Sequence, residues 1–265
     1  MERLTQHADL LAASANDPWV RWYLPDPFLG EVWVHDGVAL VQRLRRRPGF
    51  WVAPLAGAPV SEPSSESARV RAALVALRDG GHFDRLEAAS VSVVQGHAAV
   101  AHEVLDLAEG GDWEWMWCAA APPRLPQEDQ VVALDDTADA AELEAFTRAH
   151  NPRVWTEVGS GRVQQWRGLR DDSGALVAIG GAEVGDAGAP HLAGIVTAGA
   201  HRGQGYGSVV SAALTRWALE QHGVCTLGMF SDNHVARGVY ERLGFRTARA
   251  WHSRALMRRA VADHS

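Results

Sequence analysis

The chain of 265 residues contains no lysine, only two cysteines, and no apolar run of the ~18–20 residues that a membrane-spanning helix needs. The missing lysine excludes a nucleotide-binding P-loop, whose Gly-Lys-Ser/Thr motif depends on that side chain. The N-terminus also lacks the charged-then-apolar pattern of a signal peptide. These absences predict a cytoplasmic protein without a membrane partner.

The scarce cysteines and scattered histidines argue against a metal site. Cys118 and Cys225 each lie within an apolar stretch, which is more typical of buried free thiols than of a disulfide or a metal pair. The twelve histidines show no ligand spacing, so we expect no bound metal. A formal net charge of −7 argues against a nucleic-acid partner, and the short basic run 45–47 is more typical of a solvated turn.

The most informative segment is a glycine-rich hexapeptide, Arg202-Gly203-Gln204-Gly205-Tyr206-Gly207. Apolar residues 192–196 before it predict a buried strand, and apolar residues on one helical face over 209–218 predict a helix after it. Such a turn leaves backbone N–H groups unpaired at a helix N-terminus, where the dipole adds roughly half a positive charge. We therefore expect an anion site for a phosphate or diphosphate.

The glycine spacing decides between known loops. Gly207 comes too early for a dinucleotide fingerprint. The remaining pattern, R-x-x-G-x-G, resembles the acetyl-CoA loop of the GNAT superfamily of N-acetyltransferases. A tight turn that merely tolerates glycine is the alternative for the loop alone. The resemblance continues downstream as N-x-x-A-x-x-x-Y-E-R-L-G-F from Asn233 to Phe245, one predicted helix and one strand later. Two motifs in the correct order make the joint signal strong.

The resemblance implies an α+β GNAT fold, with a mostly antiparallel mixed sheet flanked by helices. The proline-containing segment 119–126 is the expected linker. We predict a catalytic acetyl-CoA-binding domain over 127–265. Its predicted elements are strands at 131–134, 162–170, 175–183, 192–196 and 224–230, helices at 138–150, 209–218 and 235–243, and a final strand pair within 246–257.

The N-terminal half mimics this order, which predicts a tandem repeat of the same fold. Its predicted elements are a hairpin at 31–35 and 38–43 across Asp36-Gly37, a strand at 50–55, a helix at 66–77 started by Ser64 or Ser65, a strand at 91–94, a helix at 98–107 and a strand at 113–118. The loop 56–63 has no R-x-x-G-x-G, and its prolines and acidic residue would misplace or repel a diphosphate. We predict a degenerate, non-catalytic GNAT-like module over 1–121; an unrelated α+β domain is the alternative.

The resemblance assigns the cosubstrate acetyl-CoA to the loop and to the strand before it. In relatives this strand splays from its neighbour and frees backbone groups for the pantetheine arm. A free N–H near Val196 would also stabilise an oxyanion. Gly194 fits either a β-bulge or a glycine that admits a neighbouring side chain, and Asn233 either binds the cofactor or caps a helix. The expected cofactor-binding residues are Val196, Thr197, Arg202, Gly203, Gln204, Gly205, Tyr206, Gly207, Ser208 and Asn233.

Three residues are catalytic candidates. Tyr240 is the predicted general acid, because a phenol that titrates near pH 10 is protonated at neutral pH and can protonate a leaving thiolate. A core tyrosine at helical spacing is the alternative, but the surrounding downstream motif favours the general acid. The predicted base is His191, eleven residues before Arg202. Glu183 is its rival, a strand-edge histidine is the alternative for His191, and some relatives use no dedicated base.

We therefore predict an N-acetyltransferase that moves the acetyl group of acetyl-CoA to an amine by direct attack. The acceptor is a small-molecule or peptide amine, and the chain is a monomer or homodimer. The alternative is a catalytically silent acyl-CoA-binding or sensor module, against which Tyr240 argues because mere binding needs no proton donor. A scaffold built on the tryptophans of 113–117 is the least supported possibility.

Overall fold

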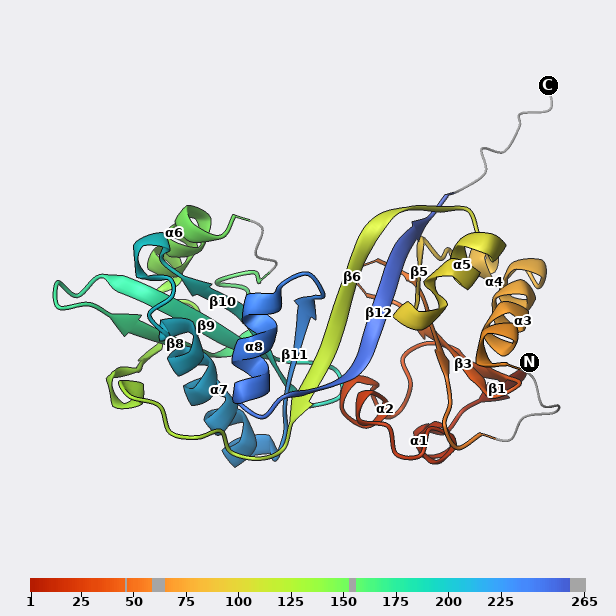
Figure 1. Ribbon diagram of the computed structural model, residues 1–265, viewed down its shortest axis with the longest axis horizontal. Coiled ribbons are helices and arrows are strands. Elements are labelled where there is room, and N and C mark those ends of the chain that lie inside the picture. Colours follow the sequence, from red (N-terminus) through yellow and green to blue (C-terminus); the bar gives the residue numbers. More distant parts are fainter. Residues whose placement is uncertain (46, 59–64, 153–155, 258–265) are drawn as a thin grey trace, which may run out of the picture. The chain divides into compact units, whose positions relative to one another are not determined.

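The computed structural model describes residues 1–45, 47–58, 65–152 and 156–257 (Figure 1). The chain divides into two compact units. Unit 1 comprises residues 1–114, 230–232 and 249–265, and unit 2 comprises residues 115–229 and 233–248. Over the described residues, every helix is too short or too polar to span a bilayer. The expected linker 119–126 lies inside unit 2, so the boundary between modules 1–121 and 127–265 stays a prediction.

Unit 1 opens with a strand and two short helices that the sequence pattern did not predict. The hairpin turn was predicted correctly: Asp36 and Gly37 have φ of 46° and 72°, which only such turn residues adopt readily. Ser65 starts the long helix, because its hydroxyl accepts the Ala68 N–H at 3.2 Å. The elements are β1 (Glu2–Leu4), α1 (His7–Ala13), α2 (Pro18–Tyr23), β2 (Val32–His35), β3 (Val38–Arg43), β4 (Gly49–Pro54), α3 (Glu66–Asp79), α4 (His82–Arg85), β5 (Ser90–Val94), α5 (Ala98–Val104) and β6 (Leu107–Cys118).

The second half of the chain follows the predicted order closely. Its elements are β7 (Val132–Leu134), α6 (Ala140–His150), β8 (Val163–Arg170), β9 (Leu176–Val184), β10 (Pro190–Thr197), α7 (Tyr206–His222), β11 (Cys225–Phe230), α8 (His234–Arg242) and β12 (Arg246–Leu256). The expected strand pair within 246–257 was wrong, because β12 is one continuous strand. Its residues Trp251–Ala255 pair with Val94–Ser90 of β5, so the second strand of the expected pair comes from the other half of the chain.

The two halves repeat one pairing pattern. β1–β2, β2–β3 and β3–β4 are antiparallel and β4–β5 is parallel. β7–β8, β8–β9 and β9–β10 are likewise antiparallel, and β10–β11 is parallel. A helix connects the parallel strands in each half, since parallel neighbours need a crossover. The predicted mixed, mostly antiparallel sheet and tandem repeat are both confirmed.

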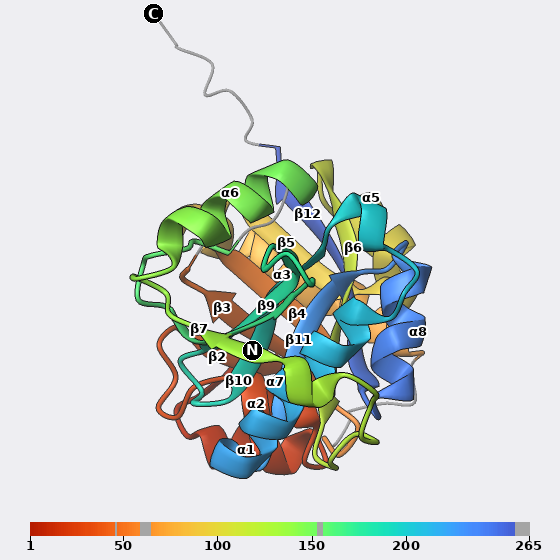
Figure 2. The same ribbon diagram turned by 90° about the vertical axis from the view of Figure 1, so that its left-hand side faces the viewer.

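Apolar side chains bury both faces of the unit 2 strands. Val210 and Leu214 of α7, with Leu243 after α8, pack on residues of β9, β10 and β11. Leu143 and Phe146 of α6 pack on the opposite face with Trp166 and Val196. Figure 2 shows α6 and α7 as separate layers beside these strands. The strand β10, at whose end the loop to α7 begins, is therefore packed against apolar side chains on both of its faces.

Candidate active site

The glycine-rich loop lies where β10 ends and α7 begins. Gly203 and Gly205 have φ of 78° and 88°, in the left-handed region that disfavours residues with a Cβ. Gly205 is also the N-cap of α7 and offers no side chain to cap it. A Cβ on Gly207 would come 3.1 Å from the Thr197 hydroxyl. The glycines thus let the loop turn sharply and lie close against the end of β10.

The loop contains a run of backbone donors without a protein acceptor. Within the described part of the chain, no acceptor is bonded to the amides of residues 203–207, whereas the Ser208 and Val209 amides both donate to the Gly205 carbonyl. α7 continues for seventeen residues behind these groups. Its dipole therefore adds positive potential at the same point. Five amides without a protein acceptor at a helix start can bind an anion such as a phosphate group, and we call them the anion cradle.

β10 is bulged and leaves its parallel neighbour early. It pairs with β11 only at His191–Thr226 and Leu192–Leu227, then continues to Thr197 without pairing to β11. On its other edge the register to β9 shifts between Ala193 and Val196. Gly194 has a φ of 63° at this point, so the bulge is present, and a Cβ on Gly194 would also come 3.1 Å from the Thr156 hydroxyl, so both roles that the sequence allowed are found. The extra residue reverses the side-chain alternation, which sends Val196 to the α6 face although Leu192 faces α7.

The bulge also decides which amides point to the open edge. Ala198 donates its N–H to Val177 of β9 at 2.9 Å. Since hydrogen-bonding directions alternate along a strand, Val196 faces β9 as well and Thr197 faces the side that β11 has left. The donor at the open edge is therefore the Thr197 amide, one residue beyond Val196.

Arg202 holds the loop in place through its side chain. Its Nη2 donates to the His150 carbonyl at the end of α6 at 2.9 Å, and its Nε donates to the Thr197 carbonyl at 3.3 Å. The guanidinium thus satisfies a carbonyl that α6 leaves unpaired at its C-terminus. Its position is explained by these two bonds, and contact with a diphosphate stays a prediction for Arg202.

His191, Glu183 and Thr226 gather on one face of the strands. His191 is opposite Glu183 of β9 in the antiparallel register and opposite Thr226 of β11 in the parallel one. Leu192 and Leu227 face the core beneath α7 and α8. The preceding residues, His191 and Thr226, therefore face the α6 side. The two rival base candidates are cross-strand neighbours, which the sequence could not reveal.

A hydrogen-bond chain orients the imidazole of His191. The buried Thr226 hydroxyl donates to the Pro190 carbonyl at 2.9 Å, so its oxygen accepts from His191 Nδ1 at 3.0 Å. Nδ1 then carries the proton in the neutral ring, and Nε2 is the basic nitrogen. Glu183, with a side chain 13% exposed, also lies 3.9 Å from the Arg162 guanidinium. Thr226 is a functional candidate that sequence reasoning missed, since a threonine in a buried strand carries no motif.

Tyr240 lies on α8, against the core on the other side of the strands. Its ring packs edge-on against Phe245 at a centroid distance of 5.8 Å. Burial, together with the neighbouring Cys225 thiol, raises the pKa of Tyr240 to about 12. Among the described residues, nothing hydrogen-bonds the Tyr240 hydroxyl. The phenol is therefore a protonated donor over the whole physiological pH range.

Asn233 caps α8, since its Oδ1 accepts the Ala236 N–H at 3.1 Å. The cap uses only the oxygen of the amide, and the role of its nitrogen toward a cofactor stays a prediction. Both cysteines are buried free thiols, as predicted. The described residues contain no group of three or more side chains that could hold a metal ion.

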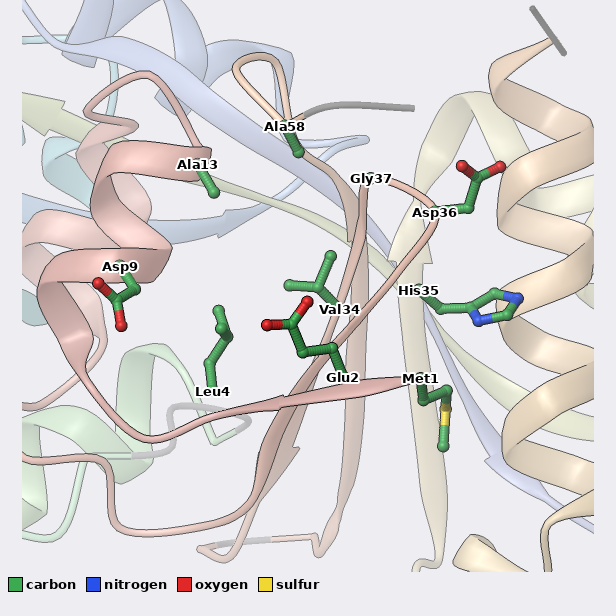
Figure 3. Close-up of a pocket in the computed structure, with 10 residues that line it drawn as sticks. All are labelled: Met1, Glu2, Leu4, Asp9, Ala13, Val34, His35, Asp36, Gly37 and Ala58. Carbon is green, nitrogen blue, oxygen red and sulfur yellow. The ribbon is translucent and has the colours of Figure 1, made fainter. Parts of the chain in front are cut away.

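Two hollows of the described surface are lined by other residues than these groups. The first measures about 440 Å³ and lies in unit 1 between β1, α1 and the β2–β3 turn (Figure 3). Figure 3 shows the carboxylates of Glu2 and Asp9 on facing sides of this space. A second hollow of about 360 Å³ lies beside α6 in unit 2. We place the functional site at the cradle rather than at either hollow, because only the cradle combines free amides, a helix start and a departing strand.

The corresponding parallel strands in the first half of the chain separate less than β10 and β11 do. β4 stays paired with β5 over four residues, from Gly49–Ser90 to Val52–Val93, and ends only two residues later at Pro54. The predicted loop 56–63 lies mostly outside the described residues. The parallel strands of unit 1 thus free far less backbone than those of unit 2.

Comparisons with known proteins agree with this geometry. Residues 127–245 match the model of the Acetyltransferase (GNAT) family. This part of the chain belongs to the GNAT family. The match spans the cradle, β10 and the Tyr240 helix, and it covers the segment that the glycine motifs predict. No curated protein sequence matches the chain.

Solved GNAT structures share the fold over most of the chain. A GCN5-related N-acetyltransferase from Kribbella flavida is 21% identical, with 88% of this chain and 91% of that chain covered and a TM-score of 0.51. A GNAT-family acetyltransferase from Colwellia psychrerythraea is 14% identical, with 83% and 81% covered and a TM-score of 0.53. A GCN5-related N-acetyltransferase-like protein from Streptococcus suis is 13% identical, with 96% and 98% covered and a TM-score of 0.50. At these identities the likeness confirms the predicted GNAT fold alone.

Proposed function

We propose that this GNAT chain is an acetyl-CoA-dependent N-acetyltransferase whose site lies in its C-terminal half. The observation that carries the proposal is the run of amides without a protein acceptor at residues 203–207, which follows the end of β10 that is not paired with β11. A diphosphate fits these amides, and an extended pantetheine arm fits the hydrogen-bonding edge that β11 has left. Acetyl-CoA would supply an acetyl group as a reactive thioester.

His191 is the proposed base for the attacking amine. Its Nε2 is the basic nitrogen because Thr226 holds the proton on Nδ1. The ring lies on the α6 face of β10, six residues before Thr197, whose amide faces the open edge of the strand. Glu183, opposite His191, would favour the imidazolium that forms when the amine loses its proton.

Tyr240 is the proposed acid for the departing thiolate. With a pKa of about 12 it is a weaker acid than an ordinary thiol near 8.5. It would therefore act first as a hydrogen-bond donor to the developing charge. A bound cofactor would bury the sulfur as well and raise the pKa of that thiol, as burial does for Cys225. The two values then approach each other, and proton transfer becomes easier.

The decisive experiment combines calorimetric binding of coenzyme A with acetyl-CoA turnover over a panel of amines. We expect micromolar binding and turnover with at least one amine class. Binding without turnover on any amine would favour the acyl-CoA sensor. Absence of binding at millimolar coenzyme A would refute the assignment of the cradle.

A further inference from the structure

Unit 1 contains a hydrogen-bonded serine, histidine and glutamate that the proposed acetyltransferase does not use. Ser67 Oγ lies 3.2 Å from His97 Nδ1, and His97 Nε2 lies 2.8 Å from Glu66 Oε1. The His97 side chain is 8% exposed, whereas Ser67 reaches the surface. We propose that Ser67, His97 and Glu66 form a nucleophilic acyl-transfer site for small esters or thioesters, with water as the final acceptor.

The contacts fix the proton positions that such chemistry needs. A carboxylate only accepts hydrogen bonds, so Nε2 of His97 carries the proton that faces Glu66. Nδ1 is then the basic nitrogen, and it accepts the hydroxyl proton of Ser67. A nucleophile bonded to a base that a third group orients is the arrangement that activates serine in hydrolytic enzymes. Here the two ring nitrogens exchange the positions they have in the familiar proteases.

The N-terminus of α3 supplies groups that can stabilise the negative charge that forms during acyl transfer. Ser67 is the second residue of this fourteen-residue helix. Ser65 Oγ accepts a hydrogen bond from the Ala68 amide, and the Ser65 carbonyl accepts one from the Arg69 amide. Among the described residues, no acceptor is bonded to the amides of Glu66 and Ser67. The oxyanion forms on the carbonyl oxygen of the acyl group that Oγ attacks, and these two amides are the backbone donors available to it at the helix start. The helix dipole favours that negative charge.

The reaction balances with water alone. Oγ of Ser67 bonds to the acyl carbon while its proton moves to Nδ1 of His97. The bond from that carbon to the leaving alcohol or thiol breaks, and the leaving group takes the proton from Nδ1. Water then attacks the Ser67 ester, its proton passes through Nδ1 back to Oγ, and a carboxylic acid is released.

The full chain would be treated with a fluorophosphonate reagent, and the modified peptide identified by mass spectrometry. We expect one adduct per chain, on Ser67, that does not form on the urea-unfolded chain. Ser67→Ala should remove it, and His97→Gln should slow labelling about 100-fold, the usual effect of losing a general base. Glu66→Gln should slow it less, because an amide oxygen still accepts from Nε2 and the site is half exposed.

Release of nitrophenolate from 4-nitrophenyl acetate provides a second readout. We expect its rate to fall in the same order as the labelling rate: least for Glu66→Gln, more for His97→Gln, and completely for Ser67→Ala. Circular dichroism would establish that each variant is folded. An unmodified native chain, an adduct on another residue, or equal labelling of His97→Gln would overturn the proposal and leave these residues as a polar network at the start of α3. None of these readouts involves coenzyme A, so the result is independent of the acetyltransferase assignment.

Discussion

His191 and Thr226 lie opposite each other in the first of the two rungs that join β10 to β11, and a 3.0 Å hydrogen bond connects their side chains. The same threonine hydroxyl donates to the Pro190 carbonyl. A buried hydroxyl thus fixes the tautomer of the imidazole at the point where the strands separate.

Thr226→Val should lower kcat/KM about tenfold, because valine keeps the shape but cannot hold His191 Nδ1. It also leaves the Pro190 carbonyl unpaired, at a cost of about 1–3 kcal/mol in unfolding free energy. Steady-state kinetics over a pH range and urea unfolding would measure both effects. Thr226→Ser keeps the hydroxyl and is the matched control. If Thr226→Val and the parent chain had equal kcat/KM and equal pH dependence, Thr226 would have no role in orienting the base, and the proposal that His191 is the base would be weakened.

Tyr240→Phe should lower kcat about 100-fold and leave the affinity for coenzyme A nearly unchanged. The substitution removes only the hydroxyl and keeps the ring contact with Phe245. Single-turnover kinetics and calorimetry would separate the two quantities. An unaltered kcat would show that Tyr240 is a packing residue.

Gly205→Val should abolish coenzyme A binding. Gly223→Val is its matched control, because both glycines flank α7 with φ of 88° and 71° and both have open space where a Cβ would be. A β-branched residue strains both positions, so thermal unfolding should show similar losses of stability. Calorimetry should detect binding only in the Gly223 variant; binding by both would contradict the cradle.

The raised pKa of Tyr240 predicts a loss of stability in alkali. The unfolded phenol ionises near pH 10 and the folded one near 12, so the folded state holds the proton more tightly between these values. Stability from this group is complete below pH 10 and falls as the pH rises toward 12, by roughly 2–3 kcal/mol in total. Urea unfolding from pH 9 to 11 should show a steeper decline for the parent chain than for Tyr240→Phe. Parallel curves would show that the phenol is not desolvated.

Both thiols should be unreactive in the folded chain. Burial raises the pKa of Cys118 and of Cys225, which leaves little thiolate. Ellman's reagent should find two thiols in urea and almost none, over minutes, in buffer. Rapid reaction of one thiol in buffer would indicate that its part of the core opens.

Sequence alone was informative wherever a structure depends on neighbouring residues. The glycine-rich segment 202–207 predicted a turn, and the apolar spacing after it predicted α7, because the conformational freedom of glycine and helical periodicity act within a few residues. The caps at Ser65 and Asn233 and the turn at Asp36-Gly37 follow from equally local chemistry.

Strand partners were decided only by the tertiary structure. An alternating strand does not specify which other strand it joins, so the sequence could not show that the end of β12 pairs with β5 in unit 1. The meeting of His191 with Glu183 and Thr226 has the same origin, since register between distant strands places their side chains together. The residues that form the cradle could thus be identified from short-range rules, while the residues that orient the base depended on hydrogen bonds across the assembled sheet.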